Sequence, residues 1–387
     1  DQKKALYDAL WICKASKVQE MLRNNRRLAN ISYSNGDTVL MIAVEHAAGM
    51  LTSRCVELLL DAGANPNKAN NEGFTPLYVA AQNGHETCVK LLLEAGADKD
   101  KARNDGVTPL YVAAQQGHIG AVKLLLDSGA DKDKASNIGV TPLYVAVQQG
   151  HDRIVKLLLN ARANPDKADK DGGTPLMVAA FEGHIGVVKL LLNARADKDY
   201  RNKNGSTPLT FAVDKRHDRI VKLLLDDGAW PNFENNYGYT PLFIAAQKGY
   251  NQIVEMLLNR DAKINRLSGH KNERMTPLMR AVLNNHKQTV KILLENGADP
   301  DIADNKGVTP LLHAMVQYSD NNDITNFKML LEYDADPNKP FNSGEEVPLD
   351  YALNYGNRKM FELLLAAGAN LKNNVSLLQE VYDKPEI

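Results

Sequence analysis

Residues 71–102 read NEGFTPLYVAAQNGHETCVKLLLEAGADKDKA, and this stretch carries the signals for two helices and a loop. Thr75 can cap a helix whose first residue is Pro76, because the N–H that proline lacks would have no partner at that position. Gly84 is placed to end this short helix, since glycine adopts the left-handed conformation that closes one. A second, leucine-rich helix is predicted between Gly84 and Gly96. The polar segment that follows is predicted to be an extended finger.

The same pattern recurs along the chain with a period of 33 residues, apart from one step of 36 between Thr240 and Thr276. Thr-Pro-Leu begins at Thr75, Thr108, Thr141, Thr174, Thr207, Thr240, Thr276 and Thr309, with degenerate copies at 38–40 and 347–349. A Gly-Ala-Asp/Asn marker keeps the same spacing, and both markers count ten units between about residues 34 and 370. A unit of this size cannot bury its leucine-rich helix alone. The units must therefore stack into a solenoid.

The period and the Thr-Pro-Leu motif resemble the ankyrin repeat over nearly the whole chain. The resemblance implies an all-α solenoid in which each repeat is a helix-turn-helix followed by a β-hairpin finger. It also implies a curved stack, in which the fingers and first helices line the concave side and the second helices form the back.

The domain boundaries follow from where the repeats begin and end. Residues 1–33 are predicted to form an N-terminal capping helix pair, and residues 34–370 the array of ten repeats. Residues 371–387 are predicted to be a tail or a short capping helix, with SLLQEVYD at 376–383 as the helical part.

Three segments near 46–54, 266–275 and 316–327 lengthen the loops of their repeats. The run Ser-Asp-Asn-Asn-Asp at 319–323 is predicted to be a loop. Such loops often carry function, although neutral variation at surface turns is the commoner explanation. The chain begins without Met, so we expect it to be a fragment of a longer protein or a processed form.

The composition excludes several classes of protein. Lys plus Arg number 46 and Asp plus Glu number 47, and this balance argues against binding nucleic acid by charge. No run of 18 apolar residues is present, so no membrane insertion is expected. Three cysteines are too few for a disulfide framework and favour a cytoplasmic location, which would be the host cytoplasm for a bacterial effector. A monomer is expected.

Six histidines occupy one repeat position, at the start of the second helix. They are His85, His118, His151, His184, His217 and His286. Equivalent residues of stacked helices lie about 8–10 Å apart, whereas zinc needs nitrogens about 2 Å away. The row is therefore predicted to bond near the inter-helix turn and to hold no metal.

The sequence offers no catalytic residues and no cofactor site. Cys55 and Cys88 fall where other repeats carry Val or Ile, and Cys13 lies on the apolar face of the capping helix. No Walker loop, G-x-G-x-x-G, H-E-x-x-H or G-x-S-x-G is present, so an enzyme is not expected.

Two further repeated features are predicted to be structural. Tyr78, Tyr111 and Tyr144 directly follow Thr-Pro-Leu, and packing between repeats is favoured over a binding stripe. The alternating charges of DKDKAR and DKDKAS are predicted to be a solvated surface.

The strongest candidate for a binding site is GAWPNFENNYGYTP, residues 228–241. Four aromatic residues stand here on a finger that is polar in other repeats, and such residues are favoured interface anchors. The predicted partner-binding residues are Trp230, Phe233, Tyr237 and Tyr239, with Phe181, Lys215 and Lys248 beside them. The alternative is that the aromatic residues pack on neighbouring fingers.

The resulting hypothesis is a non-catalytic scaffold that binds one or more protein partners on its concave surface. One alternative is the recruitment domain of a larger enzyme or effector. Another is nucleotide or small-ligand binding, because the repeats with longer loops resemble the ankyrin domain of the oligoadenylate-dependent endoribonuclease. The aromatic and basic positions, however, do not align with that domain residue by residue.

Overall fold

The computed structural model describes residues 2–47, 53–269, 274–321, 323–341 and 346–371. The predicted helix at 376–383 and parts of the loops near 46–54 and 266–275 lie outside these residues. The chain divides into two compact units, Asp1–Asp197 and Lys198–Ile387, which are described here separately.

Unit 1 consists of helices joined by short turns and fingers. Its elements are α1 (Gln2–Trp11), α2 (Ala15–Asn24), a 3-10 helix η1 (Arg26–Asn30), α3 (Val39–Glu45), α4 (Ser53–Asp61), α5 (Pro76–Asn83), α6 (Glu86–Glu94), α7 (Pro109–Gln116), α8 (Ile119–Asp127), α9 (Pro142–Gln148), α10 (Asp152–Asn160), α11 (Pro175–Glu182) and α12 (Ile185–Asn193).

Unit 2 continues the alternation of first and second helices. Its elements are α13 (Pro208–Asp214), α14 (Asp218–Asp226), α15 (Pro241–Lys248), α16 (Asn251–Leu258), α17 (Pro277–Leu283), α18 (Lys287–Glu295), α19 (Pro310–Asn321), α20 (Thr325–Glu332), α21 (Pro348–Asn354) and α22 (Arg358–Ala366). Within the described part of the chain no helix has the length and apolar character needed to cross a membrane.

The first helix of each repeat that carries Thr-Pro-Leu begins as the sequence predicts. The hydroxyl of Thr75 accepts the backbone N–H of Tyr78 at 3.1 Å, and Pro76 is the first helical residue. Gly84 ends the helix in the left-handed conformation, with φ +69°. The same cap recurs at Thr108, Thr141, Thr174, Thr207, Thr240, Thr276 and Thr309.

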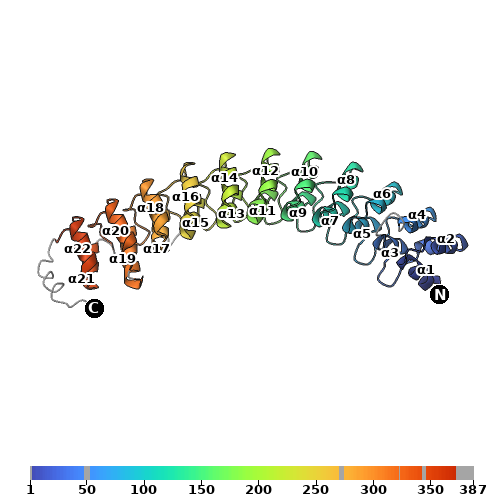
Figure 1. The fold of residues 1–387 in the computed structure, drawn as a ribbon, viewed down its shortest axis with the longest axis horizontal. Helices are drawn as coiled ribbons and strands as arrows, with labels where there is room; N and C mark the ends of the chain where they lie inside the picture. The colour runs from blue at the N-terminus through green and yellow to red at the C-terminus, as the bar shows by residue number, and fades with distance from the viewer. Residues whose placement is uncertain (1, 48–52, 270–273, 322, 342–345, 372–387) are drawn as a thin grey trace. The chain divides into compact units, whose positions relative to one another are not determined.

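Each unit has its core between two rows of helices. Within each unit the second helices form one row, the first helices form the other, and the fingers project on the side of the first helices (Figure 1). Leu77, Ala81 and Leu92 of one repeat are fully buried. The residues that follow Thr-Pro-Leu, including Tyr78 and Tyr144, are also buried, which confirms their predicted packing role.

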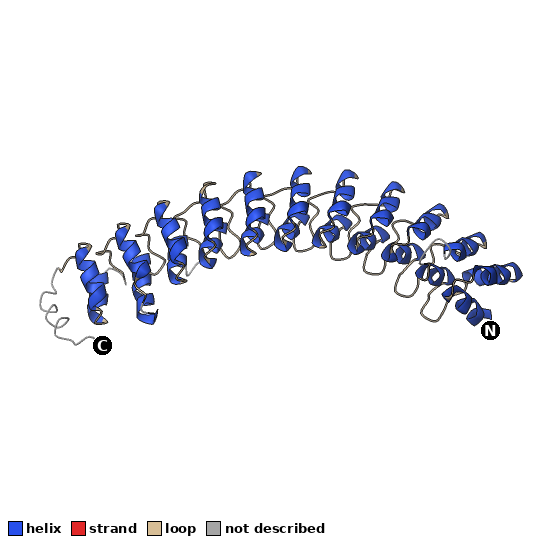
Figure 2. Ribbon diagram, viewed as in Figure 1, coloured by secondary structure: helices blue, strands red, loops and turns tan. Residues whose placement is uncertain are grey.

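The fingers are hydrogen-bonded turns that contain no regular strand in the described residues, as Figure 2 shows. The backbone N–H of Asn70 donates to the carbonyl of Phe74 at 2.9 Å within one finger. Consecutive fingers are also joined, since the N–H of Asn137 donates to the carbonyl of Asp105 at 2.8 Å. The expected β-hairpins are thus reduced to turns and isolated bridges, such as Ser268 with Met275.

The structure corrects one predicted loop. Helix α19 continues to Asn321, so residues 319–321 of the Ser-Asp-Asn-Asn-Asp run are helical. At the ninth helix position other first helices have already turned, with positive φ at Gly117 and Gly249 and also at Arg216 and Asn285, so a missing glycine does not explain the extension. The repeat that holds α19 is longer than the others, since 38 residues separate Thr309 from Val347, and part of this added length extends the helix.

Candidate functional site

We call the surface that the fingers and first helices form in each unit its finger face. The predicted binding residues lie on or beside it, so their surroundings determine which of them are available to a partner.

The histidine row has a structural role, as predicted. The imidazoles of His118, His151, His184 and His286 contact the carbonyl oxygens of Gln82, Gln115, Gln148 and Gln247 at 2.9, 3.2, 3.2 and 2.9 Å. Each carbonyl belongs to the last turn of the first helix in the preceding repeat. These carbonyls have no partner within their own helix, so the imidazole of the next repeat satisfies them.

The charged finger residues are not merely solvated, which corrects the prediction. The carboxylate of Asp100 accepts the N–H of Asp131 at 2.8 Å, and its carbonyl accepts Nζ of Lys134 at 2.7 Å. The turn between repeats leaves backbone groups unpaired, and side chains of the adjacent repeat satisfy them. In the same way, the carboxylate of Asp166 accepts the backbone N–H of Asp197. Burial raises the pKa of Asp166.

Trp230 is exposed at the base of its finger. Its side chain is 49% exposed, and its backbone N–H donates to the carboxylate of Asp199 at 2.8 Å. In other fingers an Asp, an Asn or, at Lys263, a lysine donates the equivalent backbone N–H, so the fold does not need the indole. The ring is therefore available to a partner.

Tyr237, Tyr239 and Phe243 form an aromatic stack that runs from the finger onto α15. Tyr239 lies parallel to Phe243, with ring centroids 5.1 Å apart and planes 5° apart. Tyr237 stacks on Tyr239 at 6.3 Å and is 52% exposed, whereas Phe243 is fully buried. Tyr237 is thus the exposed end of a stack anchored in the core, and Tyr239 has a packing role as well.

The other predicted site residues differ in their availability. Phe233 lies under the guanidinium of Arg201, 5.4 Å from its ring centroid. Lys248 donates to the carbonyl and to Oδ1 of Asp214, both at 2.8 Å. Lys215 is exposed at the end of α13. Phe181 belongs to unit 1, where it is 39% exposed on α11.

The sequence reasoning missed a polar group beside the aromatic stack. Arg280 on α17 lies over Phe243, with its Cζ 5.2 Å from the ring centroid. His313 on α19 has Nε2 3.4 Å from the carboxylate of Asp304. Burial lowers the pKa of His313, Asp304 opposes this effect, and Arg280 and Lys306 reinforce it. The signal was present, because Arg280 and His313 stand where the repeats of unit 1 carry Val79 and its equivalents.

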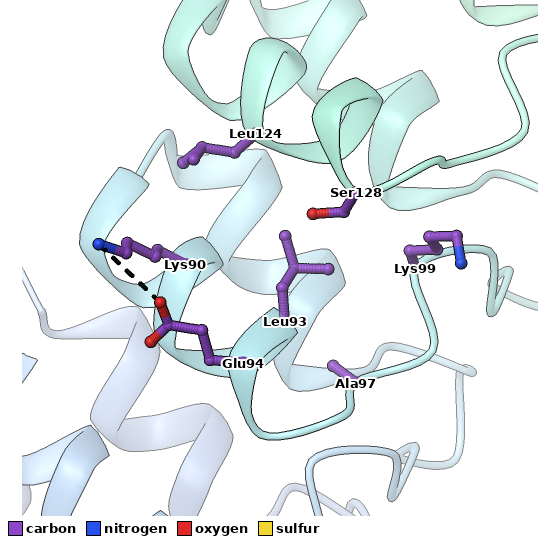
Figure 3. Close-up of a pocket in the computed structure, with 7 residues that line it drawn as sticks. All are labelled: Lys90, Leu93, Glu94, Ala97, Lys99, Leu124 and Ser128. Atoms are coloured by element: carbon purple, nitrogen blue, oxygen red, sulfur yellow. Dashed lines mark ion pairs between the residues drawn. The ribbon is translucent and has the colours of Figure 1, made fainter.

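A separate surface pocket of about 310 Å³ lies in unit 1 between α6 and α8 (Figure 3). Lys90 and Glu94 form an ion pair of 3.9 Å at its edge. Its lining residues are Lys90, Leu93, Glu94, Ala97, Lys99, Leu124 and Ser128. The pocket is open and contains no candidate binding residue.

The described residues show no cluster of three His, Cys, Asp or Glu side chains that could hold a metal ion. Burial raises the pKa of Cys55 and of Cys88 to about 11, so both thiols are protonated at neutral pH. A protonated, buried thiol is a poor nucleophile.

Comparison with known families covers most of the chain. A family model described as ankyrin repeats (3 copies) matches residues 6–103, 40–136, 131–202, 194–268 and 278–375. No curated protein matches the chain.

Proposed function

The chain belongs to the ankyrin-repeat family, and we propose that it is a non-catalytic scaffold that binds protein partners on the finger face of unit 2. Ankyrin repeats are generally protein-interaction modules. The observation that carries the proposal is the exposure of Trp230 and Tyr237 on one finger of unit 2.

Exposed aromatic rings support binding for a physical reason. They have only two side-chain torsions, so little conformational entropy is lost when a partner fixes them. Large rings also bury much apolar area and are common hot spots, where truncation costs about 2 kcal/mol or more. Tyr239 supports Tyr237 by stacking on it, whereas Phe233 lies under Arg201 and Lys248 is paired with Asp214. Lys215, exposed at the end of α13, supplies positive charge on this face. Phe181 belongs to unit 1 and is a separate candidate contact on the finger face of that unit.

The test compares proteins captured from a eukaryotic lysate by the wild type and by the Trp230→Ala/Tyr237→Ala double variant. A captured partner is then titrated by calorimetry. Removing two anchors of this kind is expected to weaken binding by at least about 30-fold, since each 1.4 kcal/mol is a factor of ten in affinity. Tyr239 stays unchanged in this variant because its stacking on Phe243 also contributes to stability.

Ile138→Ala is the matched control. Ile138 is exposed beside the turn glycine of a unit 1 finger, the repeat position of Tyr237. Its truncation is expected to leave affinity within about twofold. Equal affinity of all three proteins for every captured partner would refute the proposal.

A further inference from the structure

Arg280 is an arginine without a polar partner in the described part of the chain. Its side chain is half-buried on α17, and its buried Nε–H has no hydrogen-bond acceptor. The guanidinium is held over the ring of Phe243, which fixes its position without neutralising it. A buried donor left unsatisfied is costly, and a binding site is one context in which this cost is offset.

The surroundings of Arg280 combine apolar and polar surface. Phe243 continues through Tyr239 to the exposed ring of Tyr237, so an apolar path leads from the guanidinium to the finger. On the following repeat, His313 and Asp304 form a second polar pair. A partner segment lying across these repeats would therefore meet rings first and then a cation.

The local charge distinguishes between classes of anion. Lys248 is paired with Asp214, and Arg266 is paired with Glu234 at 2.7 Å. Arg274 also lies 3.9 Å from Glu234. Each of these three cations already has a carboxylate within 4 Å. The guanidinium of Arg280 carries a single positive charge, which matches a carboxylate better than a phosphate dianion.

We propose that Arg280 binds a single carboxylate of an acidic peptide segment in a partner protein, while an adjacent apolar residue of that segment packs on Tyr237. The inference rests on the proposed function and specifies the chemistry of its partner. A planar guanidinium accepts a carboxylate through two parallel hydrogen bonds, which gives orientation as well as affinity.

The experiment selects binders to the intact chain from a displayed library of random twelve-residue peptides. Selected peptides are synthesised and titrated against the wild type and Arg280→Met. The peptides are expected to share an Asp or Glu next to an aromatic or aliphatic residue. Arg280→Met is expected to weaken their binding by at least about tenfold, the scale of a charge-assisted hydrogen bond.

A double-mutant cycle isolates the contact. Replacing the peptide Glu by Gln should cost at least about tenfold on the wild type and less than about twofold on Arg280→Met. Arg219→Met is the control. It removes the same positive charge, but from an exposed position on the second helix α14. Thermal unfolding checks that each variant is folded, and Arg280→Gln replaces Arg280→Met if the latter is not.

Two outcomes would overturn the inference. One is a set of selected peptides without acidic residues. The other is equal binding of acidic peptides to the wild type and Arg280→Met. If Trp230→Ala/Tyr237→Ala still abolishes binding of those peptides, the proposed function stands and only the role of Arg280 fails.

Discussion

Nζ of Lys248 donates to the backbone carbonyl of Asp214 at 2.8 Å, in the place where other repeats use a histidine. Asp214 is the last residue of α13, and the equivalent carbonyl of Gln148 contacts the imidazole of His184. In this pair of repeats Tyr250 stands at the histidine position, so a lysine two residues earlier makes the contact. The carbonyl at the end of the first helix needs a hydrogen-bond donor, and either a histidine or a lysine can supply it.

Lys248→Met is therefore expected to destabilise unit 2 by about 1 kcal/mol, a value discounted for the partial exposure of the ion pair. Adding Tyr250→His should restore at least half of the loss, because the imidazole can reach the same carbonyl. Urea denaturation of the two variants measures both effects. An unchanged midpoint for Lys248→Met would show that the contact does not hold these repeats together.

Four repeats end their second helix with a residue other than glycine in the left-handed conformation. They are Arg162, Arg195, Asp261 and Asp334, with φ of 64°, 62°, 60° and 62°. Replacing each by Gly should stabilise its unit by about 0.5–1 kcal/mol, because glycine adopts this conformation without a steric cost. Thermal unfolding of the four single variants provides the measurement.

The reverse change is the control for this prediction. A Cβ built on Gly96 meets no atom within 4 Å, so Gly96→Arg adds backbone strain without a clash. It should destabilise unit 1 by a similar amount. Lower midpoints for all four glycine variants would contradict the strain argument.

Arg280→Met is expected to raise the free energy of unfolding of unit 2 by about 1 kcal/mol, because it removes a buried donor that has no acceptor. The apolar side chain can keep its packing on Phe243. Arg219→Met, on the exposed surface of α14, should change stability by less than about 0.5 kcal/mol. Calorimetry on both variants tests this, and a clear loss of stability for Arg280→Met would mean that the arginine stabilises the fold.

His313 is expected to make unit 2 less stable as the pH falls. Burial holds its pKa in the folded state below the usual value, so the unfolded chain binds the proton first. The stability it contributes is complete above the unfolded pKa of about 6.5 and is lost as the pH falls from there to the lower folded value. Denaturation of the wild type and His313→Gln at pH 7.5 and 5.5 should show a smaller pH effect in the variant. Equal slopes would refute the assignment.

The sequence by itself determined the repeat architecture and the ends of most helices. Thr75, Pro76 and Gly84 act within one short stretch of chain, through a hydroxyl cap, a missing N–H and a left-handed turn. Signals of this kind need no tertiary contact, so their spacing predicts the helices directly. Residues 319–321 are an exception, because their polar sequence predicted a loop and the structure extends α19 through them.

Only the tertiary structure decided which polar and aromatic side chains are available. Nothing in the local sequence indicates that Lys248 bonds Asp214 of the preceding repeat. Tyr237 and Tyr239 are two residues apart, and stacking on Phe243 of α15 separates their roles. Arg280 became a candidate binding residue because its guanidinium lies over a ring on another helix and its Nε–H has no acceptor. The contacts of Lys248 with Asp214 and of Arg280 with Phe243 join residues 34 and 37 positions apart, and the roles of Tyr237 and Tyr239 depend on how the finger packs on α15. Local sequence specifies none of these contacts.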